Sequence, residues 1–96
     1  MTYIEAILHQ GGMYTKRSRD RIISEILNIC REGANKTQIV YKANLNFKTV
    51  NPYINLLIEN KLITIKIGQI VRYETTERGI NLLHNFNYIQ DALNIQ

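Results

Sequence analysis

Apolar residues recur every three or four positions in the first part of the chain, which is the spacing of one buried helix face. Ser18 can cap the first such helix, which is predicted to run to about Glu32, just before Gly33. Its apolar stripe consists of Ile22, Ile23, Ile26, Leu27 and Cys30. Because Cys30 belongs to this stripe, we interpret it as a core residue and not as a reactive thiol.

Two further helices are predicted to follow the first. The second begins at Thr37, spans Gln38 to Ala43, and ends at Asn44, a residue type that adopts the left-handed conformation of a helix end. The third is capped by Asn46 and spans roughly residues 47–60. Two helices with so short a connection have the dimensions of a helix-turn-helix.

The third helix has one buried face and one polar face. The predicted buried positions are Val50, Ile54, Leu57 and Ile58, and the predicted polar positions are Lys48, Asn51, Asn55 and Glu59. Pro52 lies inside this helix and removes one backbone hydrogen bond, so we expect an irregular or tightened first turn.

The period of the pattern changes after this helix. Two β-branched runs, residues 62–67 and 70–75, flank Gly68-Gln69, and this arrangement predicts a β-hairpin with a tight turn. A hairpin directly after a helix-turn-helix is a wing. Thr75 or Thr76 can then cap a last helix. Its apolar positions, spaced four, three and four residues apart like the seam of a coiled coil, are Leu82, Phe86, Ile89 and Leu93.

The predicted fold is therefore mainly α-helical with one small hairpin, in the α+β class. It comprises an N-terminal segment of uncertain structure (residues 1–15), a winged helix-turn-helix (residues 16–75) and a long C-terminal helix that mediates dimerisation (residues 76–96). Ninety-six residues leave no room for a second core.

Charge is unevenly distributed along the chain. Residues 13–72 hold eleven Lys and Arg against four acids, whereas residues 73–96 hold one Arg against three acids. A basic body suits a polyanionic partner. The single Cys excludes an internal disulfide, and the sequence contains neither a membrane-length apolar run nor a signal peptide pattern. These features predict a cytoplasmic protein.

The sequence has no pattern that indicates catalysis. His9 and His84 have no cluster of metal ligands near them, and one Cys cannot supply zinc-type spacing. Gly11-Gly12 is not followed by the Lys and Ser/Thr of a phosphate-binding loop. We therefore expect no enzymatic activity, no metal, no cofactor and no small-molecule ligand.

The stretch KTQIVYKANLNFKTVNPYINLLIENKLI, the hairpin, and the following YETTERGINLL resemble archaeal winged-helix proteins. More narrowly, roughly residues 17–95 are similar to small archaeal chromatin proteins that pair through a C-terminal antiparallel coiled coil. The resemblance implies double-stranded DNA binding with little sequence preference, by a nucleoid-associated homodimer. It offers no clear counterpart for residues 1–12, whose deletion we expect to leave folding and DNA binding intact.

The candidate DNA contacts lie on four elements. Polar side chains of the third helix are expected to enter the major groove, and basic residues before and within the first helix are expected to meet phosphates. The start of the second helix is suited to a phosphate, and the wing to the backbone or a minor groove beside the third helix. The predicted contacts are Arg17, Arg19, Lys36, Thr37, Gln38, Lys48, Thr49, Asn51, Asn55, Lys66, Gln69 and Arg72. The third helix lacks Arg, the strongest reader of guanine, which favours weak sequence discrimination.

Alternative interpretations remain open at this stage. The third-helix residues can form a solvated face, the start of the second helix can be ordinary capping, and the wing can be solvated. A transcriptional regulator with a defined operator would have the same fold. A protein-interaction module would use the same surface for a protein, although it would not need so basic a body.

Overall fold

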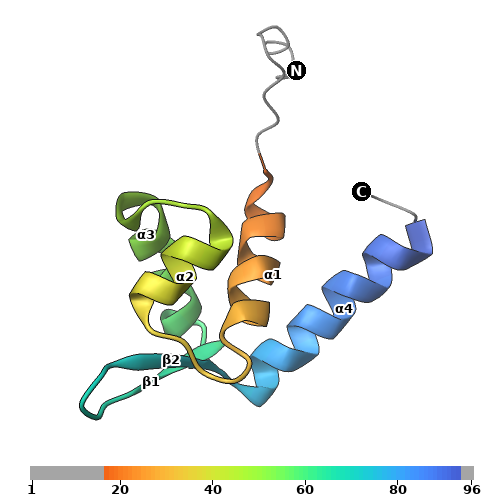
Figure 1. Ribbon diagram of the computed structural model, residues 1–96. Helices are drawn as coiled ribbons and strands as arrows, with labels where there is room; N and C mark the ends of the chain where they lie inside the picture. Colours follow the sequence, from red (N-terminus) through yellow and green to blue (C-terminus); the bar gives the residue numbers. More distant parts are fainter. Residues whose placement is uncertain (1–16, 94–96) are drawn as a thin grey trace, which may run out of the picture.

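The structure, a computed structural model, describes residues 17–93. The predicted N-terminal segment (residues 1–15), Lys16 and residues 94–96 lie outside the described residues. The elements are α1 (Arg19–Ile29), α2 (Lys36–Ala43), α3 (Phe47–Glu59), β1 (Ile63–Lys66), β2 (Arg72–Thr75) and α4 (Glu77–Leu93) (Figure 1). The predicted α+β class, with its hairpin and its long C-terminal helix, is confirmed.

Short polar side chains begin α1 and α3 as predicted. The Ser18 hydroxyl accepts a hydrogen bond from the Arg21 amide at 3.1 Å, and the Asn46 side chain accepts from the Thr49 amide at 2.8 Å. Asn44 ends α2 in the left-handed conformation, with φ 57°. Each residue satisfies or redirects backbone groups that a helix end leaves unpaired, so these local signals define the helix-turn-helix.

The predicted start of α2 is wrong by two residues. Asn35, not Thr37, is the cap: its side chain accepts from the Gln38 amide at 2.8 Å. The Asn35 amide in turn donates to the Gln38 side chain at 2.9 Å, which completes a reciprocal capping box. At α4, Thr76 is the cap, because its hydroxyl accepts from the Gly79 amide at 3.1 Å.

Pro52 does not interrupt α3, which continues on both sides of it. Its ring nitrogen cannot donate to the carbonyl of Lys48 one turn earlier. In the first turn, the Asn46 carbonyl accepts from the amides of both Thr49 and Val50, at 3.2 and 3.0 Å. This sharing is the tightened first turn that the proline led us to expect.

The hairpin differs from the prediction at its turn. The antiparallel register runs from Ile63 opposite Thr75 to Lys66 opposite Arg72, so residues 67–71 form a five-residue loop. A two-residue hairpin turn needs positive φ at its first central residue. Gly68 does not adopt it; among the glycines that the structure describes, only Gly33 has positive φ, as predicted.

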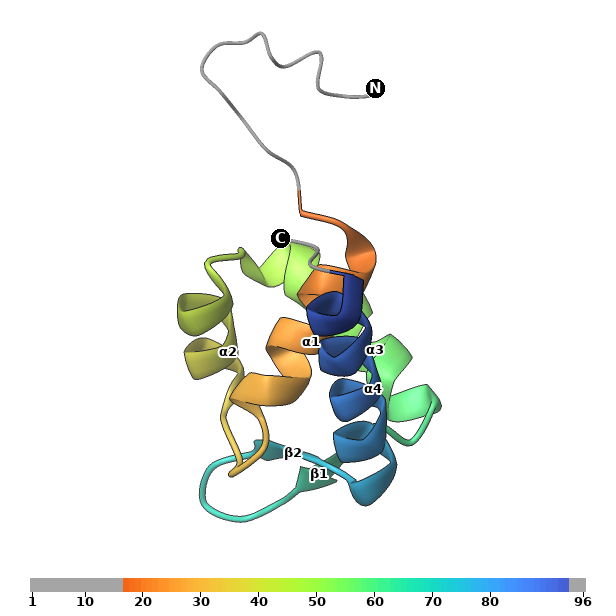
Figure 2. The same ribbon diagram turned by 90° about the vertical axis from the view of Figure 1, so that its right-hand side faces the viewer.

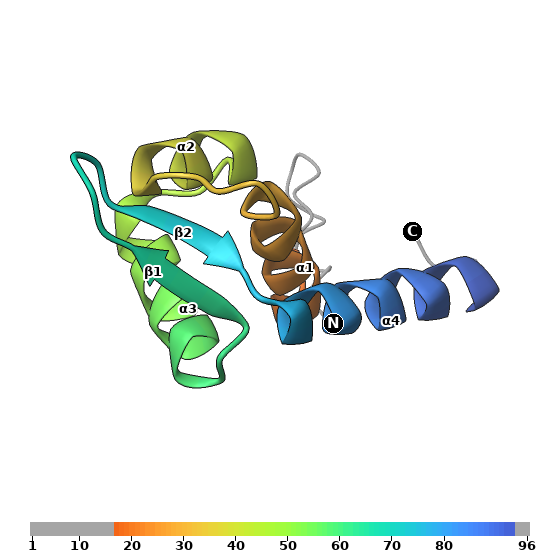
Figure 3. The same ribbon diagram turned by 90° about the horizontal axis from the view of Figure 1, so that it is seen from below.

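The second strand is also joined to the connection between α1 and α2. Ala34 and Tyr73 exchange two backbone hydrogen bonds, at 2.7 and 3.0 Å. Below them, the Thr75 hydroxyl donates to the Leu27 carbonyl at 2.7 Å, in the protein interior. The hairpin base is therefore fixed to the helical body, and its loop extends away from that body (Figures 1 and 3).

The core lies where α1, α2, α3, the start of β1 and the start of α4 meet. Its buried side chains are Ile22, Ile26, Leu27, Cys30, Ala34, Ile39, Val50, Ile54, Leu57, Ile63 and Leu83. Each large aliphatic side chain buried here stabilises the fold by about 1.5–3 kcal/mol. The sequence pattern predicted most of this core, whereas Ile23 and Ile58, which it also assigned to buried stripes, are only partly buried.

The last helix packs on α1 near its start and then projects beyond it (Figures 1 and 2). Only Gly79 and Leu83 of α4 are buried. The projecting part lies on the side of α1 opposite to α2 and α3 (Figures 1 and 3). The surface made by α2 and α3 is thereby left uncovered by α4.

Candidate nucleic-acid interface

The exposed face of α3 carries the polar side chains predicted for it. Lys48, Asn51 and Asn55 are exposed, and Thr49 is half-buried beside them. Since α3 is a continuous 13-residue helix, these side chains share one side of a rod that fits the width of a major groove.

Arg19 extends this face onto α1. It lines a shallow hollow together with Thr49 and Asn55, to which Pro52, Tyr53, Leu56 and Glu59 also contribute. The structure thus brings together three predicted contacts from two elements that are distant in sequence. A cation beside an exposed polar helix face is suited to a phosphate next to a groove.

The start of α2 offers a second anchoring point. Thr37 is exposed and Lys36 is half-buried. Gln38 is exposed as well, but its side-chain oxygen is already bonded to the Asn35 amide. Capping and phosphate binding are compatible here, because the box uses the backbone amides of Asn35 and Gln38 only, and the helix dipole favours an anion.

The two hairpin cations have partners within the protein. The Lys66 ammonium lies 3.2 Å from a Glu74 carboxylate oxygen, and the Arg72 guanidinium donates to the Gly33 carbonyl at 3.1 Å. Gln69 is exposed in the loop. The predicted role of Lys66 and Arg72 in phosphate contact would therefore compete with these bonds.

Arg17 also has partners, and the geometry does not support its predicted phosphate contact. Its guanidinium donates to Glu25 and to the carbonyls of Ala43 and Asn44, the latter two at 2.8 and 3.2 Å. These carbonyls belong to the C-terminal end of α2. A cation at a helix C-terminus stabilises it, so Arg17 links α1 to α2. The Arg21 guanidinium lies 3.5 Å from the same Glu25 carboxylate, four residues further along α1.

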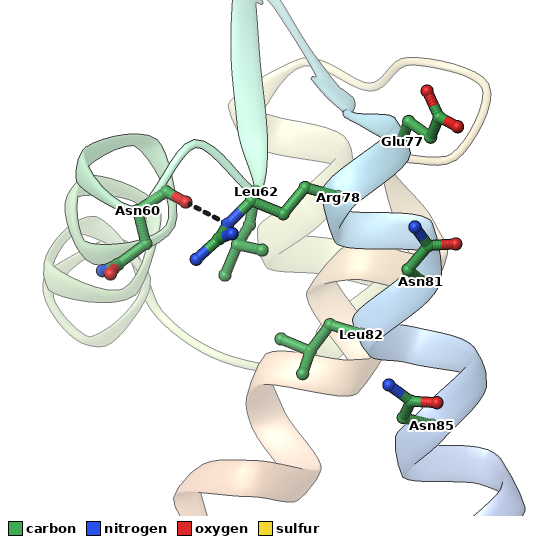
Figure 4. Close-up of a pocket in the computed structure, with 7 residues that line it drawn as sticks. All are labelled: Asn60, Leu62, Glu77, Arg78, Asn81, Leu82 and Asn85. Carbon is green, nitrogen blue, oxygen red and sulfur yellow. Dashed lines mark hydrogen bonds between the residues drawn. The ribbon is translucent and has the colours of Figure 1, made fainter.

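Sequence reasoning missed two groups that shape this region. Asn35 was identifiable, because Asn followed three residues later by Gln is a capping-box signal. Arg78 was not: its Nε donates to the Asn60 carbonyl at 3.1 Å, across a polar pocket between the end of α3 and the start of α4 (Figure 4). Nothing in the sequence around Arg78 or around Asn60 indicates this long-range contact.

The four apolar residues of the predicted seam lie along α4. Leu82, Ile89 and Leu93 are exposed, whereas Phe86 is half-buried. Leu82, Phe86 and Ile89 also line a largely apolar groove of about 230 Å³ whose other wall includes Ile23 and Leu27 of α1. The stripe is therefore continuous with the apolar surface of α1.

Between residues 17 and 93, no helix is long and apolar enough to span a membrane. The same stretch contains no group of three or more His, Cys, Asp and Glu side chains that could hold a metal ion.

The model of the winged helix-turn-helix family matches residues 16–94. The chain belongs to this family. The hairpin is thus the wing, α3 is the helix that follows the turn, and the resemblance to archaeal winged-helix proteins is confirmed by the relatives.

Two relatives come from Methanocaldococcus jannaschii, and both are uncharacterized proteins. One, MJ0287, is 36% identical over 80 residues, which cover 82% of this winged-helix chain and 79% of the relative. The other, MJ0290, is 36% identical over 75 residues, 77% of this chain but only 34% of the relative. A winged-helix unit of this type therefore also occurs within a longer protein.

A similar solved structure is that of Sso10a-2, a DNA-binding protein from Sulfolobus solfataricus. It is 27% identical, with a TM-score of 0.73, and the match covers 82% of this chain and 85% of that chain. Because the match extends over most of both chains, the two share more than a helix-turn-helix core.

Proposed function

We propose that this winged-helix protein binds double-stranded DNA as a homodimer, with little sequence preference and mainly through the sugar-phosphate backbone. It acts as a chromatin protein on cytoplasmic, nucleoid DNA and has no catalytic role. The observation that carries the proposal is the exposed face of α3, with Lys48, Asn51 and Asn55 in one row and Arg19 beside them. The DNA-binding activity named for Sso10a-2 supports it.

The composition of this face favours backbone contacts over base reading. Its cations, Lys48 and Arg19, are suited to phosphates, whereas α3 contains no Arg to read guanine. Asn51 and Asn55 are the groups that can read adenine, and they favour the second candidate, a regulator with a defined operator.

The proposed dimer rests on the stripe of Leu82, Phe86, Ile89 and Leu93. An isolated helix gains little stability from propensity alone, so a projecting helix with an apolar stripe is expected to bury it against a partner. We infer antiparallel pairing of two α4 helices, which places the winged heads at opposite ends of the pair. Each head then raises the effective concentration of the other at DNA.

A salt titration tests the DNA proposal. Binding to random-sequence and genomic duplexes is measured at several salt concentrations; with about five phosphates per head, the log–log slope is expected to be −4 to −5 per head. Similar affinity for both duplexes is expected. No duplex binding at low salt, or a slope near zero, would favour the protein-interaction module instead.

Single substitutions, measured by the same salt titration, identify which side chains contact DNA. Lys48→Ala is expected to weaken binding to every sequence equally and to reduce the slope by roughly one. Lys61→Ala is the matched control. Lys61 follows the opposite end of α3, and its backbone carbonyl accepts a hydrogen bond from the Thr76 hydroxyl. If Asn51→Ala or Asn55→Ala instead weakens the free energy of binding by about 1–3 kcal/mol on one DNA sequence alone, the regulator with a defined operator is favoured.

A further inference from the structure

The loop of the wing exposes an unusual amount of aliphatic surface. Four side chains at and beside the loop are exposed: Ile65 (42%), Ile67 (85%), Ile70 (57%) and Val71 (43%). The remaining loop residues, Gly68 and Gln69, carry no charge. Single exposed aliphatic side chains are common, but a contiguous group at the tip of a projecting element marks a contact surface.

The charges next to this loop do not make it a phosphate contact. Lys66 and Arg72 close the loop, and they are bonded to Glu74 and to the Gly33 carbonyl. Their charged groups are thus held toward the base of the wing, whereas Ile67 and Ile70 form its free end. Contacts made by these two side chains are therefore apolar.

The position of the wing loop in the fold indicates which kind of partner it can contact. The wing extends on the side of α1 that carries α2 and α3, away from the projecting part of α4 (Figures 1 and 3). The cations Lys36 and Lys48 belong to α2 and α3, and Arg19 of α1 lines the hollow beside α3. A polyanion attracted by these cations would lie next to the loop, whereas the α4 stripe available for pairing with a second copy is on the other side.

We propose that Ile67 and Ile70 form an apolar wedge that enters the minor groove of DNA held by α3, partly unstacks one base step, and bends the duplex. The inference rests on the proposed DNA binding and adds a deformation to it. Aliphatic side chains inserted from the minor groove are a known means of kinking DNA. Pyrimidine–purine steps unstack most easily, so bending is expected to concentrate at such steps without a hydrogen bond to any base.

Energy transfer between dyes at the two ends of a short duplex measures bending, and fluorescence anisotropy on the same samples measures binding. With a central TA step, saturating wild-type protein is expected to shorten the distance between the ends. The double variant Ile67→Ser/Ile70→Ser is expected to lose at least half of this change. Because it removes no charge, its binding keeps the wild-type salt slope.

Four controls make the result specific. Ile67→Leu/Ile70→Leu retains the wedge and is expected to bend DNA like the wild type, as is Gly68→Ala, which alters the same loop without removing aliphatic surface. An unchanged melting temperature of the Ser variant shows that its fold is intact. A duplex with a stiff A-tract in place of the TA step is expected to bend less.

The readouts separate the two proposals. Duplex binding by the wild type without bending, or equal bending by the wild type and the Ser variant, overturns the wedge and leaves DNA binding standing. A Ser variant that bends DNA normally but loses self-association overturns the wedge in favour of a protein contact. Absence of duplex binding by the wild type overturns the proposed function and the wedge together.

Discussion

Gly79 lies in the first turn of α4, packed against Leu62 and Thr75, and the space there excludes a side chain. A Cβ atom on Gly79 would lie 2.3 Å from the Leu62 carbonyl oxygen and 2.6 Å from the Thr75 methyl group. Backbone must move to relieve such a contact, so Gly79→Ala is expected to lower the free energy of unfolding by about 1–3 kcal/mol. Urea denaturation measures this change.

The matched control is Gly68→Ala in the wing loop. The nearest atom to a Cβ there is 3.9 Å away, an ordinary contact distance. Its effect on the free energy of unfolding is expected to stay within about 0.5 kcal/mol. Equal effects of the two substitutions would show that the close approach at Leu62 does not fix α4.

Cys30 gives the fold a dependence on alkaline pH. Burial raises the pKa of its thiol from 9.0 to about 12. Between pH 9 and pH 12 the thiol of Cys30 therefore keeps its proton in the folded state, whereas it has lost the proton in the unfolded state. The contribution of the protonated thiol to the free energy of unfolding is fully present below pH 9. It is lost as the pH rises from 9 to 12, by about 1.4 kcal/mol per pH unit at most.

The measurement is the free energy of unfolding at pH 8, 9, 10 and 11, for the wild type and for Cys30→Ala. The variant is less stable at pH 8, because it leaves a cavity in the core. Its stability is nevertheless expected to decline less steeply above pH 9. Parallel pH profiles, or rapid alkylation of Cys30 in the native protein, would contradict a buried, protonated thiol.

The residue signals that predicted the structure correctly are those that act over three or four positions. Ser18, Asn46 and Asn44 interact with backbone of their own helix, so the sequence around them contains the whole interaction. Asn35 and Thr37 compete for one role, and the reciprocal bond to Gln38 favours Asn35. The contacts of Arg17 and Arg78 join distant segments, and no local pattern indicates them.

At the scale of elements, two arginines at the start of α1, one before its cap and one in its first turn, have different roles. Arg17 holds the end of α2, whereas Arg19 faces the hollow beside α3. Arg17→Ala is expected to lower the free energy of unfolding by about 1–2 kcal/mol while the salt slope of DNA binding stays unchanged. Arg19→Ala is expected to reduce that slope by roughly one with little effect on stability.

Each variant is the control for the other, because both remove one guanidinium within a span of three residues. Melting curves and salt titrations on both proteins provide the comparison. An Arg17→Ala variant with native stability and a reduced slope would return Arg17 to the DNA interface.

The wing shows why a hairpin can be predicted from sequence while the burial of its side chains cannot. Alternating β-branched residues correctly indicated two paired strands. Ile63, Ile65 and Ile67 alternate along the first run, but of these three only Ile63 is buried. The protein interior ends at the first residue of β1, and the length of a strand that a core covers depends on the arrangement of the helices, not on the strand itself.

For the whole molecule, the proposed pairing of two α4 helices makes the state of assembly testable. Ile89→Asp places a charge in the apolar stripe and is expected to yield a folded monomer with at least tenfold weaker DNA binding. Tyr88→Asp is the matched control, since Tyr88 is also exposed but lies off the stripe. It is expected to remain dimeric in sedimentation experiments at 100 µM, about the concentration at which the wild type should be paired.

A monomeric wild type at that concentration would remove the basis for the seam, as would a dimeric Ile89→Asp protein. A monomeric variant that binds DNA as tightly as the wild type would instead show that pairing contributes nothing to affinity.

The projecting turns of α4 also have a consequence for amide hydrogen exchange. In a single chain, the amides of residues 87–93 lie beyond the packed contacts of Gly79 and Leu83, so these turns fray and exchange rapidly. Pairing would hold the same turns closed, whereas the amide of Ala34, bonded to Tyr73 inside each head, would be protected equally in both states. Deuterium uptake at the end of α4 is therefore expected to slow as the protein concentration rises, while uptake at Ala34 stays constant.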